Sequence, residues 1–133
     1  MNKKEQEFQA FVLDWYEKCG RHGLPWRQTH DPYSILVSEL MLQQTQVVRV
    51  IPKYEAFIKK YPTAQKLAKA SLGDVLRLWQ GLGYNRRAKF LLECVNVIVG
   101  EHNGVFPVDE SELLKLPGIG PYTASAICAF AYN

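Results

Sequence analysis

Apolar residues recur at steps of three and four along almost the whole chain, which is the spacing of helices with one buried face. In the stretch EQEFQAFVLDWYEKCG this spacing runs from Phe8 to Tyr16 and ends at Gly20, a C-cap candidate, so it predicts an N-terminal helix over residues 1–20. We find no stretch that alternates between apolar and polar residues as a half-buried strand does. The pattern therefore predicts an all-α fold.

Further helices are expected between turn signals. Asp31 stands as an N-cap immediately before Pro32, which predicts a helix from there to about Val48. The same periodicity predicts helices over about 52–60, 63–70, 72–80 and 85–101, with YPT and QGLGYN as turns between them.

The C-terminal part of the chain predicts two helices joined by a turn that is rich in glycine. Asp109 and Glu112 are spaced as a capping pair for a short helix that ends near Leu116, and Pro121 is expected to open the last helix. The sequence between these helices is LPGIG. Because glycine has no side chain, such a turn lets another molecule approach the backbone closely.

Amide groups of this turn are candidates for binding a phosphate. Gly118, Gly120 and Tyr122 are expected to point N–H groups outward, beside the positive end of the last helix dipole. Such an arrangement binds a phosphate without reading a base. The alternative is a tight corner between two helices, in which Gly120 serves packing alone.

Glu39 lies inside an apolar stripe of the helix that is expected to start at Pro32. Projection at about 100° per residue places it on one face with Ile35, Leu36, Leu40 and Leu42. Gln43 and Gln46 follow on the same face, which is expected to point into the protein or into a cleft. Burying such polar groups without partners costs about 1 to 3 kcal/mol each, so hydrogen-bond partners are expected. Desolvation would raise the pKa of the glutamate and keep a proton available near neutral pH, as a general acid requires. The alternative is a solvated position at the edge of the helix.

The stretch WQGLGYNRRAKFL places an aromatic residue and three basic residues where a glycine-rich turn enters a helix. Arg86, Arg87 and Lys89 are candidates for contacting phosphates, and Tyr84 is a candidate for stacking on a base or wedging into a duplex. The alternative is a charged, solvated helix start with Tyr84 packed beneath it.

Composition limits the class of protein. A chain of 133 residues with 47% hydrophobic content predicts one domain over residues 1–133 with a single core. The net charge of +3 permits a nucleic-acid partner without requiring one. The N-terminal stretch MNKKEQEF has no apolar run, which favours a cytoplasmic protein without membrane association. The three cysteines and three histidines show no metal-ligand spacing, so we expect neither a metal site nor a cofactor in this chain.

Five segments occur together in an order and approximate spacing that resemble a known family. They are LPWR, DPYSILVSELMLQQTQV, WQGLGYNRRAK, GVFP and LPGIGPYTASAI, and they cover about residues 24–131. The chain resembles the helix-hairpin-helix DNA glycosylases, and most closely the adenine glycosylases of the MutY type. The resemblance implies most of the six-helix barrel half of that fold over residues 31–133, with the hairpin at 116–122 and a C-terminally incomplete domain.

The resemblance also implies a function and the residues that perform it. It implies base excision repair of an adenine opposite 8-oxoguanine or guanine, by hydrolysis of its N-glycosidic bond after the base is flipped out of the duplex. Glu39 matches the catalytic acid, which protonates the departing adenine. The other matched positions are Gln43 and Gln44 near the lesion pair, Tyr84 at the DNA helix, and Gly118 and Gly120 in the phosphate-binding hairpin. The implied partner is double-stranded DNA with a mismatched or damaged pair, bound by a monomer.

Two parts of the family pattern are not found in these residues. Glycoside hydrolysis ordinarily uses a carboxylic acid and a carboxylate, and the family's aspartate lies after the second helix of the hairpin, beyond Asn133. The cysteines that hold a 4Fe-4S cluster in many relatives would lie there too. The resemblance therefore implies an N-terminal portion that is weak or inactive alone, with a cluster expected only in a longer form.

Three other functions stay open. Endonuclease III-like enzymes carry a lysine nucleophile where this chain has Tyr122, which argues against lyase chemistry. A tyrosine there fits thymine or uracil mismatch glycosylases as well as adenine glycosylases. The third alternative is a non-catalytic DNA-binding module that uses only the hairpin, and the position of Glu39 in an apolar stripe speaks against it.

Overall fold

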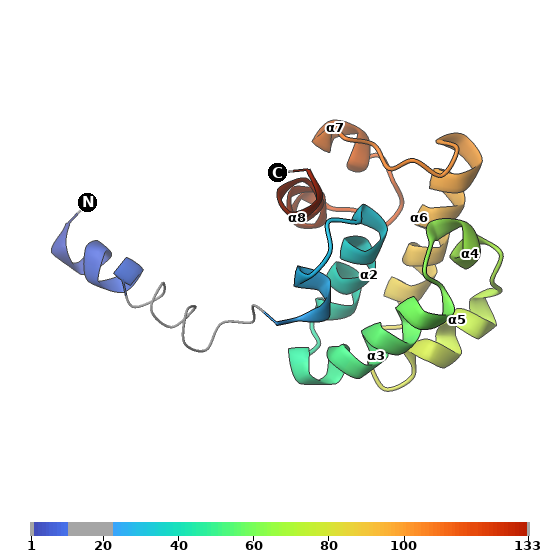
Figure 1. Cartoon of the computed structure of the whole chain (residues 1–133), viewed down its shortest axis with the longest axis horizontal. Coiled ribbons are helices and arrows are strands. Elements are labelled where there is room, and N and C mark those ends of the chain that lie inside the picture. Colours follow the sequence, from blue (N-terminus) through green and yellow to red (C-terminus); the bar gives the residue numbers. More distant parts are fainter. Residues whose placement is uncertain (1, 11–22, 133) are drawn as a thin grey trace.

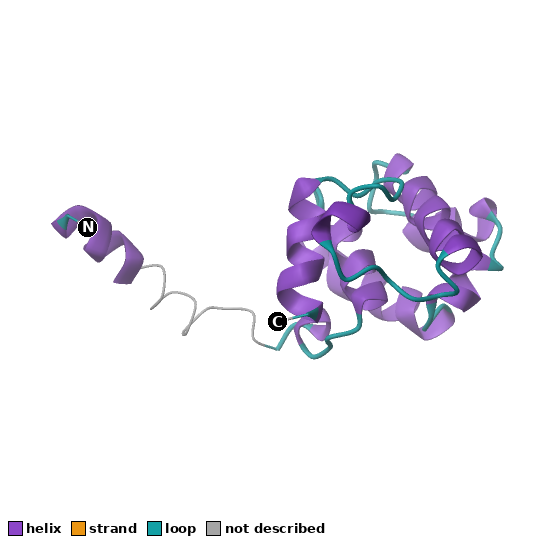
Figure 2. Cartoon of the chain, turned by 90° about the horizontal axis from the view of Figure 1, so that it is seen from above, coloured by secondary structure: helices purple, strands orange, loops and turns teal. Residues whose placement is uncertain are grey.

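A computed structural model describes residues 2–10 and 23–132 of the chain. All regular structure in these two ranges is helical, and Figure 2 shows no strand among them. The prediction of an all-α fold is therefore confirmed. Within the same ranges, no helix is both long enough and apolar enough to cross a membrane.

The helices follow one another along the chain as Figure 1 shows. They are the 3-10 helix η1 (Pro25–Arg27) and the α-helices α2 (Pro32–Leu42), α3 (Val47–Lys60), α4 (Ala64–Ala68), α5 (Leu72–Trp79), α6 (Arg86–Glu101), α7 (Glu110–Leu113) and α8 (Pro121–Ala131). Residues 3–10 are also helical. The rest of the predicted N-terminal helix, including its expected cap at Gly20, lies outside the described residues.

Helix α2 is the centre of the packed helices. Every residue from Tyr33 to Met41 is buried, and α2 contacts η1, α3, α6 and α8. Figure 1 shows it between α8 on one side and α6 on the other. The sequence predicted a one-sided apolar stripe, whereas the structure buries the helix around its whole circumference, as expected for a helix enclosed by others. Any polar side chain in the middle of α2 is thereby placed in the core.

Side chains cap three of the helices that the sequence predicted, α2, α4 and α5. Asp31 accepts hydrogen bonds from Tyr33 N at 3.4 Å and from Ser34 Oγ at 2.9 Å, so the predicted N-cap of α2 is confirmed. Thr63 Oγ1 accepts a hydrogen bond from Lys66 N at 3.2 Å at the start of α4. The bonds from Tyr33 N and Lys66 N satisfy backbone N–H groups that have no partner inside a helix.

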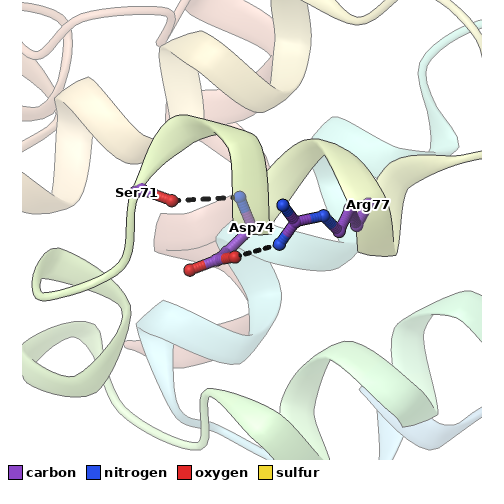
Figure 3. Close-up of polar contacts among 3 residues, drawn as sticks. All are labelled: Ser71, Asp74 and Arg77. Carbon is purple, nitrogen blue, oxygen red and sulfur yellow. Dashed lines mark hydrogen bonds and ion pairs between the residues drawn. The ribbon is translucent and has the colours of Figure 1, made fainter.

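Helix α5 begins at a serine cap. Ser71 Oγ accepts a hydrogen bond from Asp74 N at 3.1 Å, and the Asp74 carboxylate pairs with Arg77 one turn later (Figure 3). The ion pair is solvent-exposed and contributes little to stability. Helix α5 is held mainly by Val75 and Trp79, which are completely buried in the shared core.

The boundary between α2 and α3 differs from the prediction. Helix α2 ends at Leu42 rather than near Val48, because the backbone of Gln43 is extended and that of Gln44 is left-handed, with a φ of 58°. The local sequence QQTQ contains neither glycine nor proline, so it carries no signal for this break. Helix α3 starts earlier than predicted and contains Pro52, which removes one backbone hydrogen bond from the helix.

The prediction of a capping pair at Asp109 and Glu112 is wrong. Asp109 occupies the N-cap position of α7, but its side chain makes no capping hydrogen bond. The Glu112 carboxylate instead accepts a hydrogen bond from Lys115 Nζ at 2.8 Å, so it is not free to reach back to the helix start. Helix α7 ends at Leu113, before the predicted end at Leu116.

Candidate functional site

Glu39 lies on α2 inside the core. The residue is 7% exposed, and burial raises the pKa of its carboxyl group against a smaller lowering by the charge of Arg27. In the described part of the chain, no hydrogen bond reaches the Glu39 side chain. Its predicted burial is confirmed, and the solvated alternative is excluded. A carboxyl group with a raised pKa keeps its proton closer to neutral pH, which is the property that a general acid needs.

The positive charge that acts on Glu39 comes from Arg27 of the LPWR segment, to which the sequence assigned no functional role. Arg27 ends η1, and its guanidinium carbon lies 3.8 Å from the ring centroid of Phe130 on α8. The carbonyl oxygen of Phe130 lies 2.9 Å from His30 Nδ1. No spacing in the sequence pointed to this cluster, because η1 and the end of α8 are far apart along the chain.

A pocket of about 360 Å³ lies where the C-terminal end of α2 meets the start of α6 and the turn before α8. It is lined by Leu40, Gln43, Gln44, Tyr84, Asn85, Arg86, Arg87, Phe90 and Gly118. Most of the residues that the sequence singled out therefore gather here. Glu39, Gly120 and Tyr122 are not among its lining residues.

The glutamine loop, residues 43–46, connects α2 to α3 and borders this pocket. All three of its glutamines are exposed, because α2 ends before them. The prediction that Gln43 and Gln46 share the helix face of Glu39 is therefore wrong, whereas the expectation of a cleft and a hydrogen-bond partner is confirmed for Gln43, which lines the pocket. Gln43 Nε2 instead donates a hydrogen bond to Thr123 Oγ1 on α8 at 3.4 Å, which ties the loop to the last helix.

The tyrosine turn, residues 80–85, connects α5 to α6 and presents Tyr84. Tyr84 is 62% exposed, so the alternative in which it packs beneath a solvated helix start is excluded. Its φ is 47°, and the φ of Gln44 on the same pocket is 58°. Non-glycine residues rarely adopt this left-handed conformation, and such strain concentrates at functional sites. The pocket thus joins two strained and exposed residues from separate loops.

The two arginines at the start of α6 have different surroundings. Arg86 is exposed and lines the pocket, so it stays a candidate for contacting a phosphate, as does the exposed Lys89. Arg87 is 7% exposed, and its guanidinium donates hydrogen bonds to main-chain carbonyl groups and to Thr45 Oγ1. The prediction that Arg87 meets a phosphate is corrected, because its N–H groups are engaged within the protein.

The glycine hairpin, residues 116–120, connects α7 to α8. Gly118 has a φ of 75°, and a Cβ there would lie 2.5 Å from Cβ of Phe90 on α6, so the fold itself requires glycine. Gly120 has a φ of −92°, and a Cβ there would meet nothing within 4 Å. The alternative in which Gly120 serves packing alone is therefore excluded.

Amide groups of the glycine hairpin are available to a ligand. Ile119 N donates to Leu116 O at 3.3 Å, whereas among the described residues the amides of Gly118 and Gly120 have no acceptor. Tyr122 follows in the first turn of α8 and is 79% exposed. The geometry is the one expected for a phosphate site at a helix N-terminus, and its occupation by a phosphate stays a prediction.

The described residues contain no group of three histidine, cysteine or carboxylate side chains that could hold a metal ion. Cys94 is buried, and burial raises the pKa of its thiol to about 12. Burial also raises the thiol pKa of Cys128. A 4Fe-4S cluster takes about four cysteine thiolates, whereas the whole chain has three cysteines. These residues do not fit such a cluster.

Comparison with known sequences identifies relatives along nearly the whole chain. A family model described as "HhH-GPD superfamily base excision DNA repair protein" matches residues 37–116. The adenine DNA glycosylase of Mycolicibacterium smegmatis is 52% identical over 123 residues, which are 92% of this chain and 42% of that protein. The adenine DNA glycosylase of Buchnera aphidicola subsp. Baizongia pistaciae is 44% identical over 126 residues, which are 95% of this chain and 36% of that protein. The chain thus spans less than half the length of these relatives.

Solved structures have the same fold. A thermostable thymine-DNA glycosylase has a TM-score of 0.85 at 32% identity, and the match covers 98% of this chain and 60% of that chain. An endonuclease III in a non-covalent complex with DNA has a TM-score of 0.79 at 22% identity, with 99% and 61% of the two chains covered, which shows the fold alone. With the family model matching more than half of its residues, the chain belongs to the HhH-GPD superfamily of base excision DNA repair proteins.

Proposed function

We propose that this chain carries part of an adenine DNA glycosylase, which removes adenine paired with 8-oxoguanine or guanine by hydrolysing its N-glycosidic bond. The observation that carries the proposal is Glu39, a buried carboxyl group with a raised pKa and, among the described residues, no hydrogen-bond partner. A structural glutamate in a core is normally paired or hydrogen-bonded. Adenine as the target base is supported by the relatives of 44% and 52% identity, which are adenine DNA glycosylases.

Glu39 fits the role of the acid in this reaction. Its carboxyl group would protonate a ring nitrogen of adenine, and the base would leave with the electron pair of the glycosidic bond. Water would then add to the sugar cation and give up one proton to the Glu39 carboxylate. The sugar cation needs a negative charge nearby. Among the described residues, Arg27 is the one charged side chain that shifts the pKa of Glu39. The proposal therefore assigns the stabilising carboxylate to other residues, and the 133-residue chain alone is expected to excise adenine slowly.

The pocket between α2, α6 and the glycine hairpin fits the face that meets the duplex. The free amides of Gly118 and Gly120 offer donors to a phosphate, and Arg86 offers a positive charge. Gln44 and Tyr84 project from neighbouring loops, and an exposed aromatic side chain can wedge between base steps when the target base is flipped out. The proposed partner is double-stranded DNA that contains a mismatched pair.

The proposal extends to the state and location of the protein. We propose that a monomer binds one lesion. We propose a cytoplasmic location, which in a bacterial cell would be at the nucleoid, where the DNA substrate lies. No cofactor is assigned to this chain, and hydrolysis by an acid and a carboxylate requires none.

Glu39→Gln removes the acid and keeps the size of the side chain. In the full protein that carries this chain, we expect single-turnover release of adenine from a duplex with adenine opposite 8-oxoguanine to fall about 10²- to 10⁴-fold. Glu101→Gln, at the exposed end of α6, is the matched control and should keep the parental rate. A parental rate in Glu39→Gln would contradict the role of Glu39. Release of thymine from a guanine mismatch, with no release of adenine, would correct the target base.

Gly120→Ala tests the approach of a phosphate to the glycine hairpin. The added methyl group meets nothing within 4 Å and requires no change of backbone, so the Tm of the chain should not change. Because the methyl group lies beside the free amides, we expect weaker binding to every duplex, by about fivefold at low salt. Gly100→Ala, whose added Cβ also meets nothing within 4 Å, is the control. Unchanged affinity in a fluorescence anisotropy titration would contradict the phosphate site.

A further inference from the structure

Arg87 is a buried cation that the proposed chemistry does not use. In the described residues no carboxylate pairs with it, and its hydrogen-bond acceptors are main-chain carbonyl groups and one hydroxyl group. Its guanidinium carbon also lies 5.6 Å from the ring centroids of Trp79 and of Tyr84. Burial lowers the pKa of its guanidinium, although arginine stays charged in proteins. A charge in the core destabilises the fold unless it is fully hydrogen-bonded. The identity of its acceptors therefore indicates what Arg87 does.

One set of acceptors belongs to the C-terminal end of α2. Arg87 Nη1 donates to Leu40 O at 2.7 Å, to Met41 O at 2.9 Å and to Gln43 O. The last carbonyl groups of a helix have no partner inside the helix, and a cation placed there also meets the negative end of the helix dipole. Arg87 thereby stabilises the end of α2 where the glutamine loop begins.

A second set of acceptors belongs to the tyrosine turn. Arg87 Nη2 donates to Gly83 O at 3.0 Å and to Leu82 O at 3.4 Å, and Arg87 Nε donates to Tyr84 O at 3.3 Å. Thr45 of the glutamine loop joins the two sets. Its Oγ1 accepts from Arg87 Nη2 at 3.1 Å and donates to Leu82 O at 3.4 Å.

These hydrogen bonds lie next to the two strained residues of the pocket. Gln44, with a φ of 58°, follows the carbonyl of Gln43, and Tyr84, with a φ of 47°, is itself an acceptor of Arg87. Backbone strain of this kind persists only where the surrounding contacts over-determine the conformation. One guanidinium group bonds Tyr84 directly and bonds Gln43 and Thr45, the two neighbours of Gln44.

We propose that Arg87 is a positioning residue that locks the glutamine loop and the tyrosine turn into one unit, so that Gln44 and Tyr84 meet a mismatched pair at a fixed separation. The inference rests on the proposed function, because it takes duplex DNA as the partner. A lysine would keep the charge, but its three donors share one nitrogen atom, so it cannot reach both sets of carbonyl groups as the guanidinium fork does.

Two variants test the lock at different strengths. Arg87→Lys keeps the charge and removes the fork. Thr45→Val keeps the shape of the side chain and removes only the hydroxyl group between the two loops, so it stays informative if Arg87→Lys fails to fold. Arg77→Lys, at an exposed position of α5 that does not line the pocket, is the matched control.

Hydrogen exchange of the free chain reports on the lock without DNA. The amide of Thr45 is bonded to Leu42 O at 3.3 Å, and that of Leu82 is bonded to Trp79 O at 3.1 Å. We expect both amides to exchange about tenfold faster in Arg87→Lys and in Thr45→Val, and to be unchanged in Arg77→Lys. Faster exchange in one loop alone, or in neither, would overturn the coupling.

The second readout is DNA affinity, measured by fluorescence anisotropy on the full protein that carries this chain. One duplex has adenine opposite 8-oxoguanine, and the other is fully matched. The parent is expected to prefer the mismatch, and both variants should lose about fivefold of that preference while their affinity for matched DNA stays within about twofold. An equal loss on both duplexes would show that Arg87 contacts phosphate and would overturn its positioning role. A parent without any preference would overturn the proposed function, whatever the exchange rates are, and the inference with it.

Discussion

Two buried charges meet helix α2, and their surroundings differ completely. Arg87 and Glu39 are each 7% exposed. Arg87 donates hydrogen bonds to carbonyl groups of α2 and of the tyrosine turn, whereas in the described residues nothing donates to Glu39. A satisfied charge supports the fold, but a buried acid without a partner lowers stability and stays available to a ligand. Hydrogen bonding, rather than burial, therefore separates the structural charge from the candidate catalytic one.

The surroundings of Glu39 and of Arg87 also fit a catalytic role for the first and a structural role for the second. The exposed Arg27 lowers the pKa of Glu39 by less than burial raises it, so the environment on balance favours the protonated acid. Around Arg87, the bonded carbonyl groups hold two loops whose exposed residues line one pocket. Arg87 is thus held by hydrogen bonds and fixes the two loops, whereas Glu39 has no hydrogen-bond partner in the described residues.

The largest effect is expected for Arg87→Met, which keeps the length of the side chain and removes all of its donors. Several buried carbonyl groups would lose their hydrogen bonds at once, so we expect the free energy of unfolding to fall by about 3 to 5 kcal/mol. Urea unfolding followed by circular dichroism measures this change. Arg86→Met at the exposed neighbouring position is the control. A loss below about 1 kcal/mol would contradict the structural role of Arg87.

Glu39→Gln should change the free energy of unfolding by less than Arg87→Met does, and should raise it. Because the folded state holds the pKa of Glu39 above its ordinary value of 4.5, the folded state binds more protons than the unfolded state, and the stability of the parent falls as the pH rises from about 4.5 through the raised pKa. The variant has no carboxyl group at position 39, so it does not lose stability in this way as the pH rises. We expect it to exceed the parent in stability by about 1 kcal/mol near pH 8 and by much less near pH 4. Urea titrations across this pH range measure the difference, and a difference independent of pH would contradict the raised pKa.

The smallest effect is expected for Arg86→Ala. Arg86 is exposed, and its guanidinium carbon lies 5.5 Å from the ring centroid of Phe90, so its removal should change the free energy of unfolding by less than about 0.5 kcal/mol. The same variant should weaken binding to all duplexes and lower the salt dependence of that binding, if Arg86 meets a phosphate. Thermal melting and anisotropy titrations at two salt concentrations measure both results. A large loss of stability would show that Arg86, like Arg87, supports the fold, and would contradict the difference between them.

Signals that act over a few residues predicted their parts of the fold correctly. Asp31 before Pro32 predicted the start of α2, and the cap is formed by bonds to residues two and three positions later. The glycines of QGLGYN predicted the turn before α6, and Gly81 and Gly83 have φ values of 88° and 74°. Such signals depend on the backbone freedom and hydrogen bonds of adjacent residues, so they can be recognised without the rest of the molecule.

The main errors share one physical cause. Helix α2 was expected to continue to about Val48, and Arg87 was expected to face DNA. Both predictions fail at the same place, because Arg87 Nη1 bonds Leu40 O and Met41 O at the end of α2, from a position more than forty residues later. Neither QQTQ nor NRRAK contains a local signal for that contact. The same holds for Arg27, whose charge acts on Glu39 from another element of the chain.

The sequence by itself determined the helical class, the glycine hairpin and the place of Glu39 among apolar neighbours, because these features depend on spacing along the chain and on what each residue's backbone can adopt. The tertiary structure alone decided which buried charge is satisfied. Glu39 and Arg87 are both charged residues in helical segments, and no local pattern distinguishes them. Burial and hydrogen-bond partners arise from contacts between distant segments, so only the packing of α6 and the tyrosine turn against α2 makes Arg87 structural and leaves Glu39 as the candidate acid.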